Sequence, residues 1–277
     1  MGLILQGIGY TYSAGTAFSQ RALEGVTLTV ERGDLVLVLG ATGSGKSTLL
    51  RVAAGLLAAS DGTASVDGEV LTRASARGVM GLVFQDAESQ LFAETVADDV
   101  AFGPRNLGVA TSDALAAARE AMKLVGLDPV TYGGRSPFSL SGGEARRAAV
   151  AGVLAMRPRY LLLDEPTAGL DAHGRRAVRG IVETMRESAG VVIVSHTAEE
   201  FLDRASRVLV LAGGSVAFEG SGADVVSDPS LLDVGDLRPP DVLRVQQLAR
   251  TRGYDVGEFS LDPHHAAEKL ARAGGWL

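Results

Sequence analysis

The sequence predicts an α/β protein built around a mainly parallel β-sheet. Short apolar runs of strand length alternate along the chain with segments of helical periodicity. A glycine-rich loop joins one of these runs, residues 35–39, directly to a helix. An alanine-rich helical stretch, from about residue 88 to 157, then interrupts the alternation. Strands that alternate with helices are typical of a parallel sheet, so we expect such a core with an inserted helical subdomain.

The N-terminal region predicts a smaller antiparallel β subdomain. Strand patterns occupy Leu3–Tyr10 and Val26–Val30, and Asp61–Val70 has the glycine and aspartate spacing of a short hairpin. The continuous apolar run Leu35–Leu39 is instead typical of a strand that is buried on both faces. We therefore expect the buried run in the main sheet and the other strands beside it.

Residues 40–47 form a complete G-x-x-x-x-G-K-S/T phosphate loop, and a strand precedes and a helix follows it. Glycines let successive backbone N–H groups point at phosphate oxygens, and the helix N-terminus adds its dipole. Lys46 would reach the β- and γ-phosphates, and Ser47 would offer its hydroxyl to Mg²⁺. A glycine-rich turn without a ligand is the alternative, but the strand and helix favour a nucleotide site. The predicted nucleotide-binding residues here are Gly40, Ala41, Thr42, Gly43, Ser44, Gly45, Lys46, Ser47 and Thr48.

Within the helical stretch, Leu140-Ser141-Gly142-Gly143-Glu144 precedes a helix expected over Ala145–Met156. Ser141 and Glu144 have the S-x-x-E spacing of a capping box, which would start this helix in any protein. A functional interpretation is that Ser141 and the glycine N–H groups bind a phosphate at the helix N-terminus. The residues alone leave both interpretations open.

A second apolar strand, Tyr160–Asp164, ends in two carboxylates. Asp164 would hold Mg²⁺, directly or through water, as a strand-end aspartate does beside a phosphate loop. Glu165 would be the base that orients and deprotonates the attacking water. With the phosphate loop upstream, this pair predicts the second half of a nucleotide-hydrolysing site.

The last third of the chain predicts further strands and then a helical tail. Strand patterns recur at Val191–Ser195 and Arg207–Leu211, and Gly213-Gly214 turns the chain into a hairpin. Beyond Gly220 the character changes, and helices are expected over about 241–252 and 263–272. We expect residues 221–277 to form a small helical C-terminal extension to a domain over 1–220.

Composition excludes several classes of protein. The formal net charge of −7 argues against nucleic-acid binding, which normally needs a basic face. The absence of cysteine excludes disulfides and is expected of a reducing compartment. No apolar stretch approaches the roughly 20 residues of a membrane span, and the N-terminus lacks the pattern of a secretory signal.

These motifs together resemble the ATP-binding-cassette (ABC) ATPases, a class of P-loop NTPases, over roughly residues 3–220. Walker A, Q-loop, signature, Walker B, D-loop and switch histidine follow one another in the order of that family. In this chain they are residues 40–47, Gln85, residues 140–144, residues 160–165, residues 168–171 and His196.

The resemblance implies roles for residues outside the phosphate loop. It implies a head-to-tail dimer in which Ser141, Gly142, Gly143 and Glu144 of one subunit face the γ-phosphate held by Lys46 of the other. It also implies that Gln85 contacts the metal and that His196 contacts the γ-phosphate. An aromatic residue upstream of the loop stacks on adenine in the family, and Tyr12 is the expected residue, with Tyr10 and Phe18 as rivals. Glu144 stands where the family usually has glutamine, and both residues satisfy the capping box.

The segment from Gln90 to Pro104 is similar to the ATPases of energy-coupling factor transporters. That resemblance implies an ATP- and Mg²⁺-dependent subunit on the cytoplasmic side of a bacterial membrane. It would power micronutrient uptake, of a vitamin or a transition-metal ion, through a transmembrane scaffold (T) component and a substrate-capture (S) component. The ATPase would form a homodimer or a heterodimer with a paralogous ATPase. Acidic residues near the Q-loop, Glu88, Glu94, Asp98 and Asp99, could receive arginines of the scaffold or form a solvated face.

Two other functions remain open at this point. One is the ATPase subunit of a conventional ABC transporter, against which the segment 90–104 argues. The other is a soluble ABC protein without a transport role, such as those of DNA repair or translation. Those normally carry two cassettes, zinc sites or coiled coils, and this chain has one cassette and no cysteine for zinc.

Overall fold

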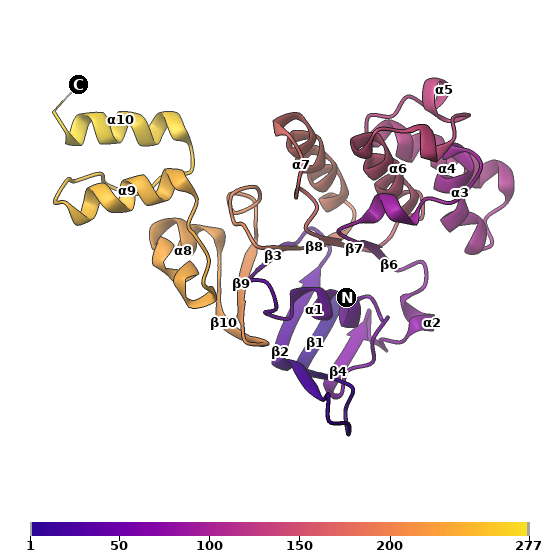
Figure 1. The fold of residues 1–277 in the computed structure, drawn as a ribbon, viewed down its shortest axis with the longest axis horizontal. Coiled ribbons are helices and arrows are strands. Elements are labelled where there is room, and N and C mark those ends of the chain that lie inside the picture. The colour runs from indigo at the N-terminus through magenta and orange to yellow at the C-terminus, as the bar shows by residue number, and fades with distance from the viewer. Residues whose placement is uncertain (1, 276–277) are drawn as a thin grey trace.

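The computed structural model describes residues 2–275 and contains two β-sheets (Figure 1). The first is antiparallel, with strand order β2-β1-β4-β5, and the second has the order β10-β9-β3-β8-β7-β6. All neighbours in the second sheet are parallel except β9 and β10, which form a hairpin. The predicted α/β class with a mainly parallel sheet is thereby confirmed. The strands are β1 Gly2–Tyr12, β2 Gln20–Glu31, β3 Leu35–Leu39, β4 Asp61–Val66, β5 Glu69–Val70, β6 Met80–Val83, β7 Tyr160–Asp164, β8 Gly190–Ser195, β9 Arg207–Ala212 and β10 Ser215–Gly220.

Helices cover the six-stranded sheet and extend beyond it at both ends. Figure 1 shows α3 to α6 grouped at the β6 end of this sheet, whereas α9 and α10 lie side by side at the opposite end. No helix in residues 2–275 is both long enough and apolar enough to cross a membrane. The α-helices are α1 Lys46–Ala53, α2 Arg73–Ala76, α3 Val96–Asn106, α4 Thr111–Leu124, α5 Pro129–Tyr132, α6 Gly142–Leu154, α7 Ala172–Arg186, α8 Gly222–Ser227, α9 Asp241–Thr251 and α10 Pro263–Ala273; short 3₁₀ helices are η1 Ala87–Gln90, η2 Pro137–Ser139 and η3 Pro229–Gly235.

The six-stranded sheet separates two hydrophobic cores. Side chains alternate between the faces of a strand, so neighbouring residues of β3 point to opposite sides. Leu37 belongs to the core that contains Ala148 of α6 and Ile181 of α7. Val38 belongs to the core that contains Leu49 of α1 and the inner face of the antiparallel sheet. Helix α6 and helix α1 therefore lie on opposite faces of the sheet (Figure 1).

Most element boundaries agree with the sequence, and the differences have local causes. Strand β1 extends to Tyr12 and strand β2 already begins at Gln20, because the two strands pair with each other up to their connecting loop. Helix α6 begins at Gly142, three residues before the predicted start, because the capping box of Ser141 already opens it there. Helices α7 and α8 lie outside the ranges predicted from the sequence.

The C-terminal helices are joined by a buried amide. Gln246 of α9 has no exposed surface. Its Nε2 atom donates to the Ser260 carbonyl at 2.8 Å, and its Oε1 atom accepts from the Ser260 N–H at 3.0 Å. Asp262 then caps α10 by accepting from the His265 N–H. The two helices therefore form one hydrogen-bonded unit.

Candidate nucleotide-binding site

The phosphate loop adopts a conformation that requires glycine. Gly43 and Gly45 have φ angles of 85° and 102°, in the left-handed region that other residues rarely enter. A side chain at Gly45 would also place its Cβ 2.5 Å from the Ala22 carbonyl oxygen. Gly45 is the N-cap of α1 and provides no side-chain cap, so the first N–H groups of that helix stay available to a ligand.

Lys46 is held at the centre of the loop. Its Nζ atom donates to the carbonyl oxygens of Gly40 at 2.7 Å and Ala41 at 3.0 Å. An ammonium group has three donors, so one remains for a phosphate. Burial lowers the pKa of Lys46, while the nearby carboxylates of Glu165 and Asp164 act in the opposite direction. The loop thus holds a partly desolvated cation where a phosphate would enter.

A cavity of about 410 Å³ brings the phosphate loop together with residues from distant parts of the sequence. Most predicted residues of the loop and of the Walker B region line it. Gln20, Arg21, Ala22, Gly213 and Gly214 also line it and were not predicted, because only the fold brings the start of β2 and the turn between β9 and β10 beside the loop. The lining residues are Tyr12, Gln20, Arg21, Ala22, Thr42, Gly43, Gly45, Lys46, Ser47, Thr48, Gln85, Asp164, Glu165, Gly213 and Gly214.

The oxygen-rich wall of this cavity suits a hard divalent cation. Asp164 lies at the end of β7 and is 8% exposed. Burial raises its pKa, although a hydrogen bond with Ser47 acts to lower it. Gln85 adds an amide oxygen to the same cavity. Carboxylate, hydroxyl and amide oxygens are the donors that Mg²⁺ prefers, so these residues fit the ion.

Glu165 sits beside this wall with a strained backbone. Its φ angle is 49°, which is uncommon for a residue other than glycine and often marks a functional position. Its Oε2 atom lies 2.8 Å from Nδ1 of His196 and accepts from the Ser195 hydroxyl at 3.3 Å. The structure therefore places His196 against Glu165, a contact that sequence reasoning did not predict.

Tyr12 is the aromatic residue of the three candidates that lines the cavity. Its hydroxyl lies 3.2 Å from Oγ1 of Thr48, and its ring meets Tyr10 edge to face at 4.8 Å. Phe18 is exposed in the loop between β1 and β2. The position of Tyr12 is consistent with the predicted stacking role.

The signature residues form a capped helix start. The Ser141 N–H and hydroxyl donate to Oε2 of Glu144 at 2.8 and 2.7 Å, and the Glu144 N–H returns to the Ser141 hydroxyl at 3.4 Å. The Tyr132 hydroxyl donates to the other carboxylate oxygen at 2.8 Å. Hydrogen bonds from the Ser141 backbone and side chain, and then from Tyr132, lower the pKa of Glu144 to about 2. Both oxygens of this carboxylate, which replaces the usual glutamine, therefore accept hydrogen bonds within the subunit.

The chain by itself does not bring the signature residues to the phosphate loop. Ser141 to Glu144 do not line the 410 Å³ cavity. They begin α6, which lies across the sheet from α1 (Figure 1). Three predicted loop residues, Gly40, Ala41 and Ser44, do not line the cavity, and the carbonyls of the first two hold Lys46.

The fold and the site define an ATP-binding cassette. A family model described as ABC transporter matches residues 23–168, which include the phosphate loop, signature and Walker B strand. The chain therefore belongs to the ABC transporter ATPase family. Solved cassettes agree: cbiO1 from Clostridium perfringens, part of the ABC transporter complex cbiONQ, superposes with a TM-score of 0.73 at 30% identity over 88% of this chain and 98% of that one. The cassette MJ0796, in a dimeric post-hydrolysis state with ADP and phosphate, has a TM-score of 0.71 at 25% identity over 79% of this chain and 98% of that one.

Within this family the chain belongs to the ATP-binding proteins of energy-coupling factor transporters. It is 41% identical to the energy-coupling factor transporter ATP-binding protein EcfA2 of Streptococcus pneumoniae, over 98% of this chain and 99% of the relative. The protein of the same name from Streptococcus pyogenes is 40% identical over the same shares. The similarity thus spans the C-terminal helices as well as the cassette.

Proposed function

We propose that this protein is the ATP-hydrolysing subunit of an energy-coupling factor importer. The observation that carries the proposal is the cavity that joins the phosphate loop to Asp164 and Glu165. The full-length similarity to energy-coupling factor ATPases supports the transport assignment. We further propose an ABC ATPase domain over 1–220, with the helical subdomain at about 88–157, and a helical extension over 221–277.

The geometry supports a direct hydrolytic mechanism. The loop N–H groups and Lys46 bind the phosphates of ATP, and Tyr12 stacks on the adenine. Glu165 orients a water molecule and accepts its proton as the water oxygen bonds to the γ-phosphorus. The bond from that phosphorus to the β–γ bridging oxygen breaks, and ADP and phosphate leave. Ser47, Gln85 and Asp164 would hold Mg²⁺, which neutralises phosphate charge when bound.

His196 and Ser195 position the base. Both contact the same carboxylate oxygen, Oε2 of Glu165, which limits rotation of the side chain. His196 is more than half exposed, and in this proposal it would also contact the γ-phosphate. In this mechanism the histidine orients Glu165 and contacts the γ-phosphate that the activated water attacks.

The separation of the signature from the phosphate loop favours action as a dimer. Ser141 of one subunit would complete the site around Lys46 of the other, in a homodimer or in a heterodimer with a paralogous ATPase. ATP would hold the two cassettes together, and hydrolysis would release them. The closing and opening would drive the membrane partners.

A groove between α3 and α6 is the proposed docking site for a helix of the transmembrane scaffold (T) component. Its volume is about 450 Å³, and Phe92 and Phe102 line it. These rings meet edge to face at 4.8 Å, yet they are 57% and 44% exposed. An apolar groove on a helical subdomain suits an amphipathic partner helix.

The acidic residues beside this groove have partners within the chain. Asp98 pairs with Arg105 at 3.1 Å, and Asp99 accepts from the backbone N–H groups of Phe92 and Ala93. The hypothesis that these two carboxylates receive arginines of the scaffold therefore loses its support. The exposed phenylalanines are the better docking residues.

The test is affinity purification of the tagged chain from native membranes in mild detergent, followed by mass spectrometry. We expect a transmembrane scaffold and a small substrate-capture (S) protein, whose identity names the micronutrient. Replacing Phe92 and Phe102 by serine should abolish this recovery while ATPase activity stays. Val130→Ser is the matched control, because Val130 is a 93% exposed apolar residue of the same helical region. Recovery of a conventional permease pair, or of soluble partners alone, would overturn the energy-coupling assignment.

A further inference from the structure

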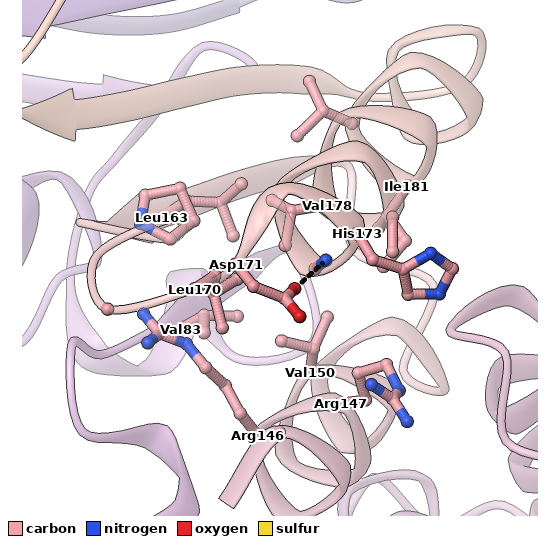
Figure 2. A pocket seen from close by; sticks show the side chains of 16 residues that line it. Val83, Arg146, Arg147, Val150, Leu163, Leu170, Asp171, His173, Val178 and Ile181 are labelled. Atoms are coloured by element: carbon pink, nitrogen blue, oxygen red, sulfur yellow. Dashed lines mark hydrogen bonds between the residues drawn. The ribbon is translucent and has the colours of Figure 1, made fainter. Parts of the chain in front are cut away.

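Arg146 connects helix α6 to the turn that follows the Walker B strand. Its Nη2 atom donates to the carbonyl oxygen of Glu165 at 2.8 Å, and its Nη1 atom donates to that of Ala168 at 2.8 Å. Figure 2 shows its side chain leaving α6 in a different direction from that of Arg147, along a cavity of about 360 Å³ between α6 and α7. One guanidinium group thus ties helix α6 to a turn that lies about 20 residues further along the sequence.

The turn held by Arg146 is the one that orients the proposed base. Glu165 has a φ angle of 49°, and its N–H donates to the Val194 carbonyl at 3.0 Å. The Ala168 N–H closes the turn on the Glu165 carbonyl at 3.2 Å. A strained backbone persists only where surrounding contacts hold it. Arg146 supplies two of those contacts, and it does so from another helix.

The same helix begins with the signature. Ser141 is the N-cap of α6, and Arg146 lies about 7.5 Å further along the helix axis. A helix moves as a rigid rod, so a shift of its N-terminus displaces the Arg146 guanidinium with it. Helix α6 therefore links the signature to the turn that Arg146 holds.

We propose that Arg146 is a positioning residue that couples the signature of a subunit to the catalytic turn of that same subunit. This inference rests on the proposed function, because it needs Ser141 to bind the nucleotide held by the partner cassette. Nucleotide on the partner then fixes α6, and Arg146 sets the backbone that carries Glu165. Each cassette senses the nucleotide held by its partner through its own helix α6.

The first test compares Arg146→Gln and Arg146→Lys in the full-length protein. Misplacement of a catalytic group by about 1 Å can cost roughly 100-fold in rate, so we expect Arg146→Gln to lower kcat at least about tenfold. The Kd for ATP should stay within about twofold, because the phosphate loop is untouched. Lysine keeps the charge but lacks the planar fork of the guanidinium group, so Arg146→Lys should recover part of the rate.

Arg186 provides a matched structural control. It also bridges two backbone carbonyls, from Nε to Gly33 at 2.7 Å and from Nη1 to Arg204 at 2.9 Å, but at the far end of α7. Arg186→Gln should lower the melting temperature about as much as Arg146→Gln and leave kcat unchanged. Equal losses of kcat in both variants, or an unchanged kcat in Arg146→Gln, would overturn the inference.

A double-mutant cycle with Ser141→Ala tests the coupling itself. If both residues act through one path, the double variant is no more than about twofold slower than the slower single variant. Losses that multiply would show independent roles and overturn the inference. Glu165→Gln separates this failure from failure of the proposed function: if Glu165→Gln retains normal turnover, the hydrolytic mechanism itself is wrong.

Discussion

Two helices of this protein begin beside candidate phosphate sites, and they begin in opposite ways. Helix α1 has Gly45 as its N-cap, and this residue has no side chain with which to cap the first N–H groups. Helix α6 has Ser141 as its N-cap, and Glu144 engages both the backbone N–H and the side chain of Ser141 in a capping box. The first helix start has no side-chain cap, whereas at the second the Ser141 hydroxyl and the Glu144 N–H already have partners within the chain.

This difference teaches how the two halves of the proposed site would divide their work. A helix start with free N–H groups binds a phosphate without giving up an internal hydrogen bond. At the capped start, the Ser141 hydroxyl must exchange its bond with Glu144 for a bond with the ligand, so its net gain is smaller. We therefore expect the phosphate loop to supply most of the ATP affinity and the signature to act mainly on turnover.

Lys46→Ala, at the phosphate loop before helix α1, should have the largest effect. It removes a charged donor to phosphate, worth about 1.5–3 kcal/mol, so the Kd for ATP should rise roughly 10- to 100-fold. Turnover should fall below detection. Isothermal titration and a phosphate-release assay measure the two effects, and Lys123→Ala on helix α4 is the control. An unchanged Kd in Lys46→Ala would contradict the nucleotide site.

Glu165→Gln should separate ATP binding at the phosphate loop from ATP hydrolysis. General-base catalysis contributes about 10²- to 10⁴-fold, so kcat should fall in that range. The Kd for ATP should change little, because the phosphate loop remains intact. We expect this variant to accumulate as a closed dimer in the presence of ATP, which size-exclusion chromatography would detect. Near-normal turnover would remove Glu165 from the role of base.

Ser141→Ala, at the capped start of helix α6, should have a smaller effect, and that effect should be on kcat. Loss of an N-cap costs about 1 kcal/mol of stability, and loss of the phosphate contact should lower kcat several-fold. Ser221→Ala is the matched control, since Ser221 forms the same kind of capping box with Asp224 at the start of α8. Both variants should melt earlier, but only Ser141→Ala should turn over more slowly. Equal kcat values for the two variants would contradict a role for the signature.

Glu144→Gln should give the smallest effect, and it depends on pH. The folded-state pKa of Glu144, about 2, lies below the ordinary value of 4.5, so the ionised carboxylate stabilises the fold. That contribution is complete above pH 4.5 and is lost as the pH falls toward 2. Since the group is partly exposed, the contribution should stay below about 1 kcal/mol. Melting curves between pH 6 and pH 2.5 should converge for wild type and Glu144→Gln at the acid end, and a constant difference would contradict the capped carboxylate.

The sequence predicted those parts of the site that depend on local structure. The strand, phosphate loop and helix around Lys46 follow one another directly, and the S-x-x-E spacing predicted the capping box of Ser141. Short-range backbone geometry and hydrogen bonding determine such features. The bond between His196 and Glu165 was not predictable in this way, because it depends on β7 and β8 being neighbours in the sheet.

The sequence by itself therefore determined the chemistry of this protein: a nucleotide loop, a carboxylate pair and a capped signature helix in the order of an ABC ATPase. The tertiary structure alone decided which of these groups meet. It placed Gln20 and Gly213 beside the phosphate loop, engaged Asp98 and Asp99 internally, and joined Arg146 to the backbone of Glu165. These contacts link residues far apart in the chain, and strand pairing and packing across the sheet fix them rather than any local pattern.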